Sequence, residues 1–92
     1  MLPDRHLVCM MKTAMLHDLH YAPKETVLKV INKFEEEELK IFFKIIFIAC
    51  ILELEGIKKT RRWIESITYA PERASLRLLM QNIIERKKLD NF

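Results

Sequence analysis

The most hydrophobic stretch of the chain is Leu39–Leu54, and between Ile41 and Leu54 only Lys44 and Glu53 carry a charge. The stretch contains no Gly or Pro and exceeds the length of a typical strand, which favours a helix. A helix that is apolar on almost every side has to be buried. The stretch is shorter than the roughly 20 apolar residues that a membrane span needs, and charged residues border it on both sides. We therefore expect the central helix of a folded domain rather than a transmembrane segment.

Four charged residues of this helix share one narrow stripe when positions are counted at 100° per residue. Two aliphatic side chains interrupt the stripe, whose members are Glu37, Lys40, Lys44, Glu55, Ile48 and Ile51. Because only this stripe is suited to face water, the aliphatic pair needs a cover, and either another helix of the chain or a helix of a partner supplies it. The residues that we expect to bind a partner are Phe43, Phe47, Ile48, Ile51 and Leu78.

Apolar residues at helical spacing predict further helices on both sides of the central one. The first runs from Asp4, a capping residue, to about His20, the second from about Pro23 to Phe34, a short one follows Gly56, and the last runs from Glu72 to about Lys88. The expected core positions of these helices are Leu7, Val8, Met11, Ala14, Met15 and Leu19; Val27, Leu28, Val30, Ile31 and Phe34; Trp63, Ile64 and Ile67; and Leu76, Leu79, Met80, Ile83 and Ile84. Leu78 lies off the apolar arc of the last helix.

The breaks between helices also have sequence signals. Four consecutive carboxylates, Glu35–Glu38, are favourable at the start of a helix and unfavourable at its end, so we place a bend near residues 34–36, although one continuous helix is an alternative. Gly56 is the only glycine and directly follows the apolar helix, where a left-handed C-cap is expected. Tyr21-Ala22-Pro23 and Tyr69-Ala70-Pro71 are 48 residues apart, and each predicts a tight joint between two helices.

Length and composition agree with this pattern. With 92 residues, half of them hydrophobic and only one Gly and three Pro, the chain fits one domain over residues 1–92. The expected fold is all-α, with about five helices in antiparallel hairpins, either tetratricopeptide-like or a small bundle. Cys9 and Cys50 form no paired motif and Met1–Arg5 lacks the pattern of a secretory signal, so we expect a reducing compartment, the cytoplasm.

The charge is distributed unevenly along the chain. Residues 1–55 carry seven Lys/Arg and nine Asp/Glu, a balance of −2, whereas residues 56–92 carry nine and four, a balance of +5. Four basic residues, Lys58, Lys59, Arg61 and Arg62, precede Trp63 and are candidates for contacting phosphates while the indole stacks on a base. No nucleic-acid-binding motif is visible, and Trp63 continues the apolar period of its helix, which argues against this interpretation.

Catalytic and metal chemistry find no support in the sequence. There is no Gly-rich phosphate loop, and consecutive carboxylates point in different directions around a helix instead of converging, so we expect no enzyme. His6, Cys9, Thr13, His17 and His20 share one face of the first helix. His6 and His17 are eleven residues apart, about 16 Å along a helix, so one ion cannot bridge them. We expect no metal site and no cofactor.

One family resembles part of the chain, over about residues 24–68. The resemblance rests on the helix ending in Phe34, the acidic Glu35–Glu38, the long helix Leu39–Glu55, the turn at Gly56 and the helix through Trp63–Thr68. These features resemble the small tetratricopeptide-like chaperones of bacterial type III secretion needle subunits. The resemblance implies a cytoplasmic protein that, with a smaller co-chaperone, holds the amphipathic carboxyl-terminal helix of the needle subunit in an apolar groove and prevents premature polymerisation.

Three functional hypotheses follow. The first is a chaperone or adaptor that binds an amphipathic helix of a protein partner in a groove. The second is a small nucleic-acid-binding regulator that uses the segment Lys58–Arg62. The third is an immunity-type bundle that inhibits a toxin. We expect the first, a heteromeric protein complex without a nucleic acid.

Overall fold

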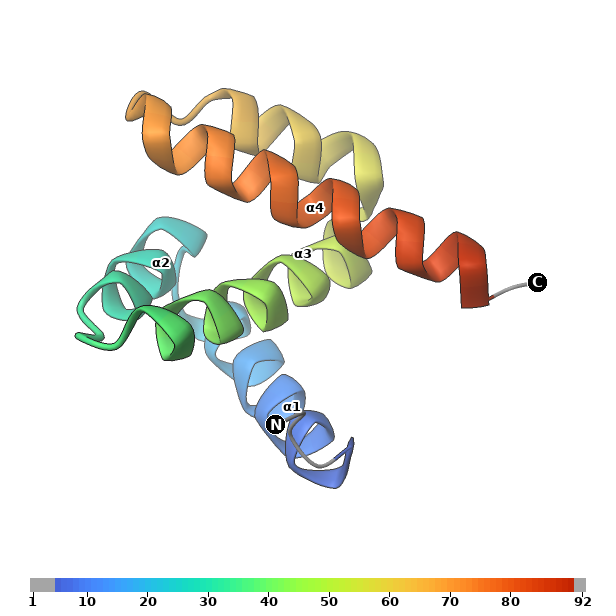
Figure 1. Ribbon diagram of the computed structural model, residues 1–92. Helices are drawn as coiled ribbons and strands as arrows, with labels where there is room; N and C mark the ends of the chain where they lie inside the picture. The colour runs from blue at the N-terminus through green and yellow to red at the C-terminus, as the bar shows by residue number, and fades with distance from the viewer. Residues whose placement is uncertain (1–4, 91–92) are drawn as a thin grey trace.

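The computed structural model describes the backbone of residues 5–90 and the side chains of residues 5–86. This part of the chain folds into four helices and contains no strand, which confirms the all-α class (Figure 1). The helices are α1 (Arg5–Tyr21), α2 (Lys24–Asn32), α3 (Glu37–Glu65) and α4 (Ala70–Asp90). The predicted capping residue Asp4 lies outside the described residues.

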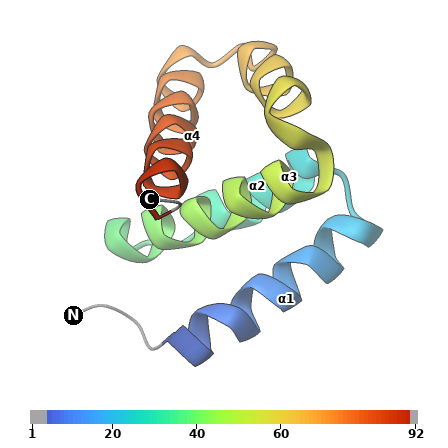
Figure 2. The ribbon, with the colours of Figure 1, turned by 90° about the vertical axis from the view of Figure 1, so that its right-hand side faces the viewer.

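Gly56 divides α3 into a first part, residues 37–55, and a second part, residues 57–65. Its φ of 84° and ψ of 171° are non-helical, and the chain direction changes there (Figure 2). The sequence predicted a left-handed C-cap at Gly56. The positive φ agrees with this prediction, but the ψ is extended and differs from that of a left-handed C-cap. The helix resumes at once, so the expected number of about five helices is not confirmed. Residues 5–90 form four helices, one of them broken at Gly56.

The hydroxyl of Thr60 stabilises the start of the second part of α3. Its Oγ1 donates a hydrogen bond of 2.7 Å to the carbonyl oxygen of Gly56, one turn earlier. Thr60 is fully buried, so a hydroxyl without a partner at this position would be costly. The bond satisfies both the buried side chain and a carbonyl at the helix break.

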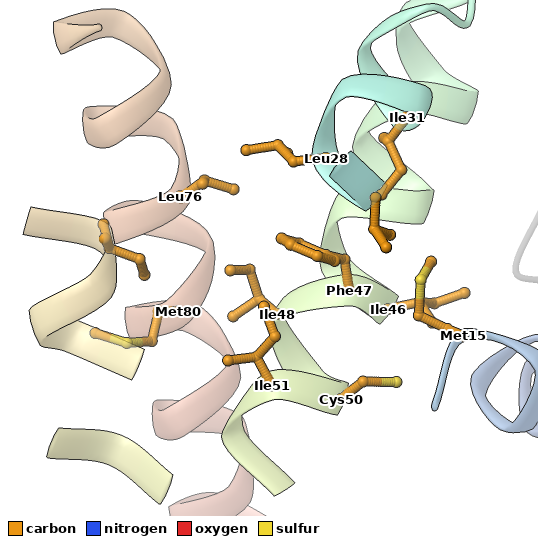
Figure 3. Close-up of a cluster of buried hydrophobic side chains, with 12 residues drawn as sticks. Met15, Leu28, Ile31, Ile46, Phe47, Ile48, Cys50, Ile51, Leu76 and Met80 are labelled. Carbon is orange, nitrogen blue, oxygen red and sulfur yellow. The ribbon is translucent and has the colours of Figure 1, made fainter. Parts of the chain in front are cut away.

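α4 packs across α3 and covers the stripe that the sequence suggested would face water. Ile48 and Ile51 of this stripe are buried and lie close to Leu76 and Met80 of α4 (Figure 3). Lys44, on the same stripe, is only 8% exposed. Its expected exposure is therefore wrong, because the chain itself supplies the helix that covers the stripe.

α1 and α2 pack on other sides of α3. Met15 of α1 lies beside Ile46, and Phe47 points towards Leu28 and Ile31 of α2 (Figure 3). Each of these two helices buries only part of its predicted apolar face. Three positions expected in the core are exposed instead, namely Leu7, Ala14 and Val30. They are exposed because the neighbouring helices cover only part of the surface of α1 and α2.

The predicted bend and joints occur at the expected places. α2 ends at Asn32 and α3 begins at Glu37, which confirms the break near residues 34–36. Tyr21 ends α1 just before Pro23, the residue preceding α2, and Tyr69 directly precedes α4. Glu37 and Glu38 lie in the first turn of α3, where the helix dipole favours negative charge.

Candidate protein-binding groove

The residues expected to bind a partner do not form one surface. Phe47 and Ile48 are fully buried and Ile51 is 1% exposed, so the chain itself, and not a partner, covers them. Phe43 is half-buried and stacks on Phe34, with ring centroids 5.0 Å apart. Leu78 is 59% exposed, as its position off the apolar arc predicted. It follows buried Leu76 by two residues, about 200° around α4, and therefore faces away from the other four.

An open apolar groove lies instead between the first part of α3 and the carboxyl-terminal half of α4. Ile45 forms one wall and is 39% exposed. Leu79 and Ile83 of α4 form the other wall, and polar side chains complete the rim. The lining residues are Ile45, Leu79, Asn82, Ile83, Glu85 and Arg86. Ile41 precedes Ile45 by one turn on the same face and is 48% exposed, so it extends the apolar surface along α3.

The groove is open because the neighbours of α3 leave one side of it uncovered. Lys44 faces α4 and Ile46 faces α1, and Ile45 lies about 100° from each. In Figure 2, α4 and α1 lie on different sides of the first part of α3, and α2 lies behind it. The side that bears Ile41 and Ile45 therefore has no helix against it in the described part of the chain.

The rim of the groove carries both signs of charge. Glu85 accepts a hydrogen bond of 3.4 Å from Gln81, and Arg86 is exposed. Glu38, also exposed, precedes Ile45 by seven residues and so lies on the same face of α3, two turns towards its start. An apolar floor with charged groups at its edges suits a helix that is apolar on one face and polar on the other.

Sequence reasoning missed this groove. Leu79 and Ile83 were assigned to the core of the last helix and are half-buried, while Ile41 and Ile45 were not singled out. The sequence contains no signal that distinguishes them, because α3 is apolar on nearly every side before its neighbours are placed.

The basic segment Lys58–Arg62 lies on the second part of α3, and its four Lys and Arg side chains are all exposed. Trp63, however, is not available for stacking on a base. Its Nε1 donates a hydrogen bond of 2.9 Å to Oε1 of Glu25, and Nζ of Lys24 lies 5.4 Å from the ring centroid. The indole thus joins the start of α2 to α3.

The same contacts fix the geometry of the break at Gly56. Nζ of Lys24 lies 2.6 Å from Oε2 of Glu55, the residue before the glycine, and the Trp63 ring meets Phe47 edge to face with centroids 5.8 Å apart. The hydrogen bond from Trp63 is the main cause that lowers the pKa of Glu25, because it stabilises the carboxylate. The start of α2 therefore binds residues on both sides of the break.

A more polar pocket lies between the second part of α3 and α4, and two of its charged groups, Glu65 and Arg77, are paired with each other. Nε and Nη2 of Arg77 donate to the two carboxylate oxygens of Glu65, both at 2.7 Å. These hydrogen bonds lower the pKa of Glu65 and raise the pKa of Arg77. The guanidinium of Arg77, the group best suited to bind an anion, is occupied by Glu65. This pocket is therefore a weaker candidate for a binding site than the apolar groove.

Further observations concern the membrane and metal ions. Within residues 5–90, none of the helices has an apolar stretch of the length and hydrophobicity that crossing a bilayer requires. The described side chains contain no group of three His, Cys, Asp or Glu placed to hold a metal ion. His17 and His20 instead contact the ring of Tyr21, each with centroids 4.9 Å apart.

Comparison of the chain with protein-family models, with curated proteins and with solved structures finds no match.

Proposed function

We propose that this protein is an interaction module that binds an amphipathic helix of a partner protein. The observation that carries the proposal is the open apolar groove between α3 and α4, with Ile45 on one side and Leu79 and Ile83 on the other. The partner helix lies with its apolar face on these side chains and its polar face towards water.

The dimensions of the groove favour a helix over an extended peptide. Ile41 and Ile45 are one helical turn apart, so they present two aliphatic groups about 6 Å apart along α3. A partner helix meets such a surface with apolar residues at positions i, i+3 or i+4 and i+7. No sheet edge is present in the described part of the chain to receive an extended strand.

Burial of the exposed aliphatic area supplies the driving force. A fully buried Ile contributes about 1.5–3 kcal/mol, and Ile41 and Ile45 are 48% and 39% exposed, so each contributes a fraction of this on binding. Glu38, Glu85 and Arg86 contribute orientation more than affinity, because charges at a rim remain solvated. The complex is expected to be specific in orientation and moderate in affinity.

A chaperone that sequesters such a helix is the form of this function that the resemblance over residues 24–68 favours. The partner that this resemblance implies is a needle subunit of type III secretion. The resemblance also implies that α1–α2 and α3–α4 act as two tetratricopeptide-like hairpins. The repeated Tyr-Ala-Pro joints before α2 and α4 support two hairpin units.

The test is site-specific photocrosslinking in cells of the native host. A photoreactive amino acid replaces Ile41 or Ile45, and a matched control places it at Val30 of α2, which is 54% exposed and is not part of the groove. We expect positions 41 and 45 to capture the same protein and position 30 not to capture it. Mass spectrometry of the crosslinked peptide should map an amphipathic helix.

A peptide of the mapped segment provides the quantitative measurement. Ile45→Asn should weaken its binding about three- to tenfold, while Val30→Asn leaves it within twofold and both variants keep their helical circular dichroism. Equal capture at position 30, or a captured segment without helical apolar periodicity, contradicts the proposal.

A further inference from the structure

The second part of α3 carries four basic side chains in five residues. Lys58, Lys59, Arg61 and Arg62 are exposed, and none of them forms a hydrogen bond or salt bridge among the described side chains. Arg61 lies near Glu65 and helps to lower the pKa of that carboxyl, but the hydrogen bonds of Glu65 go to Arg77. The basic cluster therefore keeps a net positive charge towards an external partner.

These four side chains surround the outer face of the helix. At 100° per residue, the positions from Arg61 through Lys58 and Arg62 to Lys59 span about 160°. The buried residues of this segment, Thr60 and Ile64, lie on the opposite side. Glu65, at the end of the segment, lies on the same face but is paired with Arg77, so the solvent face of the segment is predominantly cationic.

Exposed aliphatic side chains lie on both sides of the break. Leu54 is 57% exposed and Ile57 is 46% exposed, one on each side of Gly56. Ile57 precedes Arg61 by one turn, so the two share a side of the helix. The break therefore combines positive charge with two apolar groups.

The combination of basic and aliphatic side chains favours one of two common polyanionic partners, a nucleic acid and an anionic lipid bilayer. Binding to single-stranded nucleic acid uses aromatic side chains that stack on bases, and Trp63, the aromatic residue that directly follows the basic cluster in the sequence, is hydrogen-bonded to Glu25 and covered by Lys24. An anionic bilayer offers phosphate groups for the basic residues and an apolar boundary for Leu and Ile. The aliphatic pair has a partner only in the second case.

We propose that the break in α3 docks on the surface of an anionic lipid bilayer. Lys58, Lys59, Arg61 and Arg62 contact the lipid phosphates, and Leu54 and Ile57 enter the boundary between headgroups and acyl chains. The protein lies on the membrane and does not cross it. This surface is separate from the groove between α3 and α4, so it does not depend on the proposed helix binding.

The test is flotation of the full chain with vesicles of phosphatidylcholine alone and of phosphatidylcholine with 30% phosphatidylglycerol. We expect binding to the anionic vesicles only. Lys58→Glu with Arg62→Glu should lower the partition coefficient at least about tenfold, since each basic residue near a charged surface contributes a severalfold factor. The matched control, Lys29→Glu with Lys33→Glu, changes the net charge equally at exposed positions on or next to α2 and should lower it much less.

A second pair of variants separates lipid from other polyanions. Leu54→Ser with Ile57→Ser should abolish vesicle binding at 0.15 M salt and leave binding to a DNA duplex unchanged. The proposal is overturned if both charge-reversal pairs weaken vesicle binding equally, if neutral vesicles bind as well, or if the serine variant binds vesicles like the wild type. Circular dichroism checks folding, and Lys58→Gln with Arg62→Gln replaces the reversal pair if that pair unfolds.

Discussion

The Nζ atom of Lys44 lies 2.8 Å from Oε2 of Glu72, and the two side chains are only 10% and 11% exposed. The other carboxylate oxygen of Glu72 accepts a hydrogen bond of 2.7 Å from Nδ2 of Asn32. One carboxylate therefore joins α2, α3 and α4. This pair holds α4 against the side of α3 that contains Ile48 and Ile51, and so leaves Ile45 at the edge of the groove.

Breaking this pair should destabilise the fold. Lys44→Met leaves the Glu72 carboxylate largely buried with Asn32 as its remaining partner, and we expect a loss of about 2–4 kcal/mol in the free energy of unfolding. Adding Glu72→Leu should recover at least half of this loss, because the unpaired charge is then removed as well. Urea denaturation followed by circular dichroism measures both.

The matched control is Lys12→Met, which breaks the exposed pair between α1 and α3. Lys12 and Glu53 are 36% and 49% exposed, so we expect a loss below about 1 kcal/mol. If the two Lys→Met substitutions lower the free energy of unfolding equally, burial does not make the Lys44–Glu72 pair more important for stability than the exposed pair.

Gly56 should be intolerant of every side chain. A Cβ built there has no heavy atom within 4 Å, so space is not the constraint. The φ of 84° and ψ of 171° belong to a region that is essentially restricted to glycine, and we expect Gly56→Ala and Gly56→Asn each to lose about 1–3 kcal/mol. At a left-handed cap, Asn would be tolerated better than Ala. Thermal unfolding of the two variants distinguishes these outcomes.

The two cysteines should differ sharply in reactivity. Cys50 is fully buried, its Sγ donates to the carbonyl oxygen of Lys12 at 3.6 Å, and burial raises the pKa of its thiol to about 11. Cys9 is exposed. Because the thiolate is the reactive form, a maleimide should label one site in the native protein and two in urea, as counted by mass spectrometry. Rapid native labelling at Cys50 would show that α1 opens away from α3.

The contact between Glu25 and Trp63 should make stability depend on pH in a defined direction. The pKa of Glu25 is lower in the folded than in the unfolded chain, so its contribution is present at neutral pH and lost as the pH falls below about 4.3 through the lowered pKa. Glu25 is exposed, and we expect Glu25→Ala to lose less than about 1 kcal/mol at pH 7 and less still at pH 3.

Urea midpoints at the two pH values measure this difference. Ser66→Ala is a suitable control, because its hydroxyl contacts only the carbonyl oxygen of Trp63 and does not titrate. An effect of Glu25→Ala that grows towards low pH would contradict the expected sign.

Local features of the sequence account for much of the helical framework. The apolar run Leu39–Leu54 required a buried central helix, the carboxylates Glu35–Glu38 marked the start of α3, and the two Tyr-Ala-Pro segments marked the joints before α2 and α4. Gly56 marked the break because no other residue type adopts its φ and ψ at low cost. Each of these signals acts through the backbone or within a few residues.

The tertiary structure alone decided which side of α3 each helix covers. An apolar period assigns a buried face only when other faces are polar, and α3 is apolar nearly all round, so the sequence did not show that the chain covers Ile48 and leaves Ile45 open. The charge of Lys44 predicted a solvent-exposed stripe, because its partner, Glu72, is 28 residues away and could not be recognised from the sequence. Pairing and packing across that distance bury Ile48 and Ile51 and leave Ile41 and Ile45 open, and the proposed function depends on this difference.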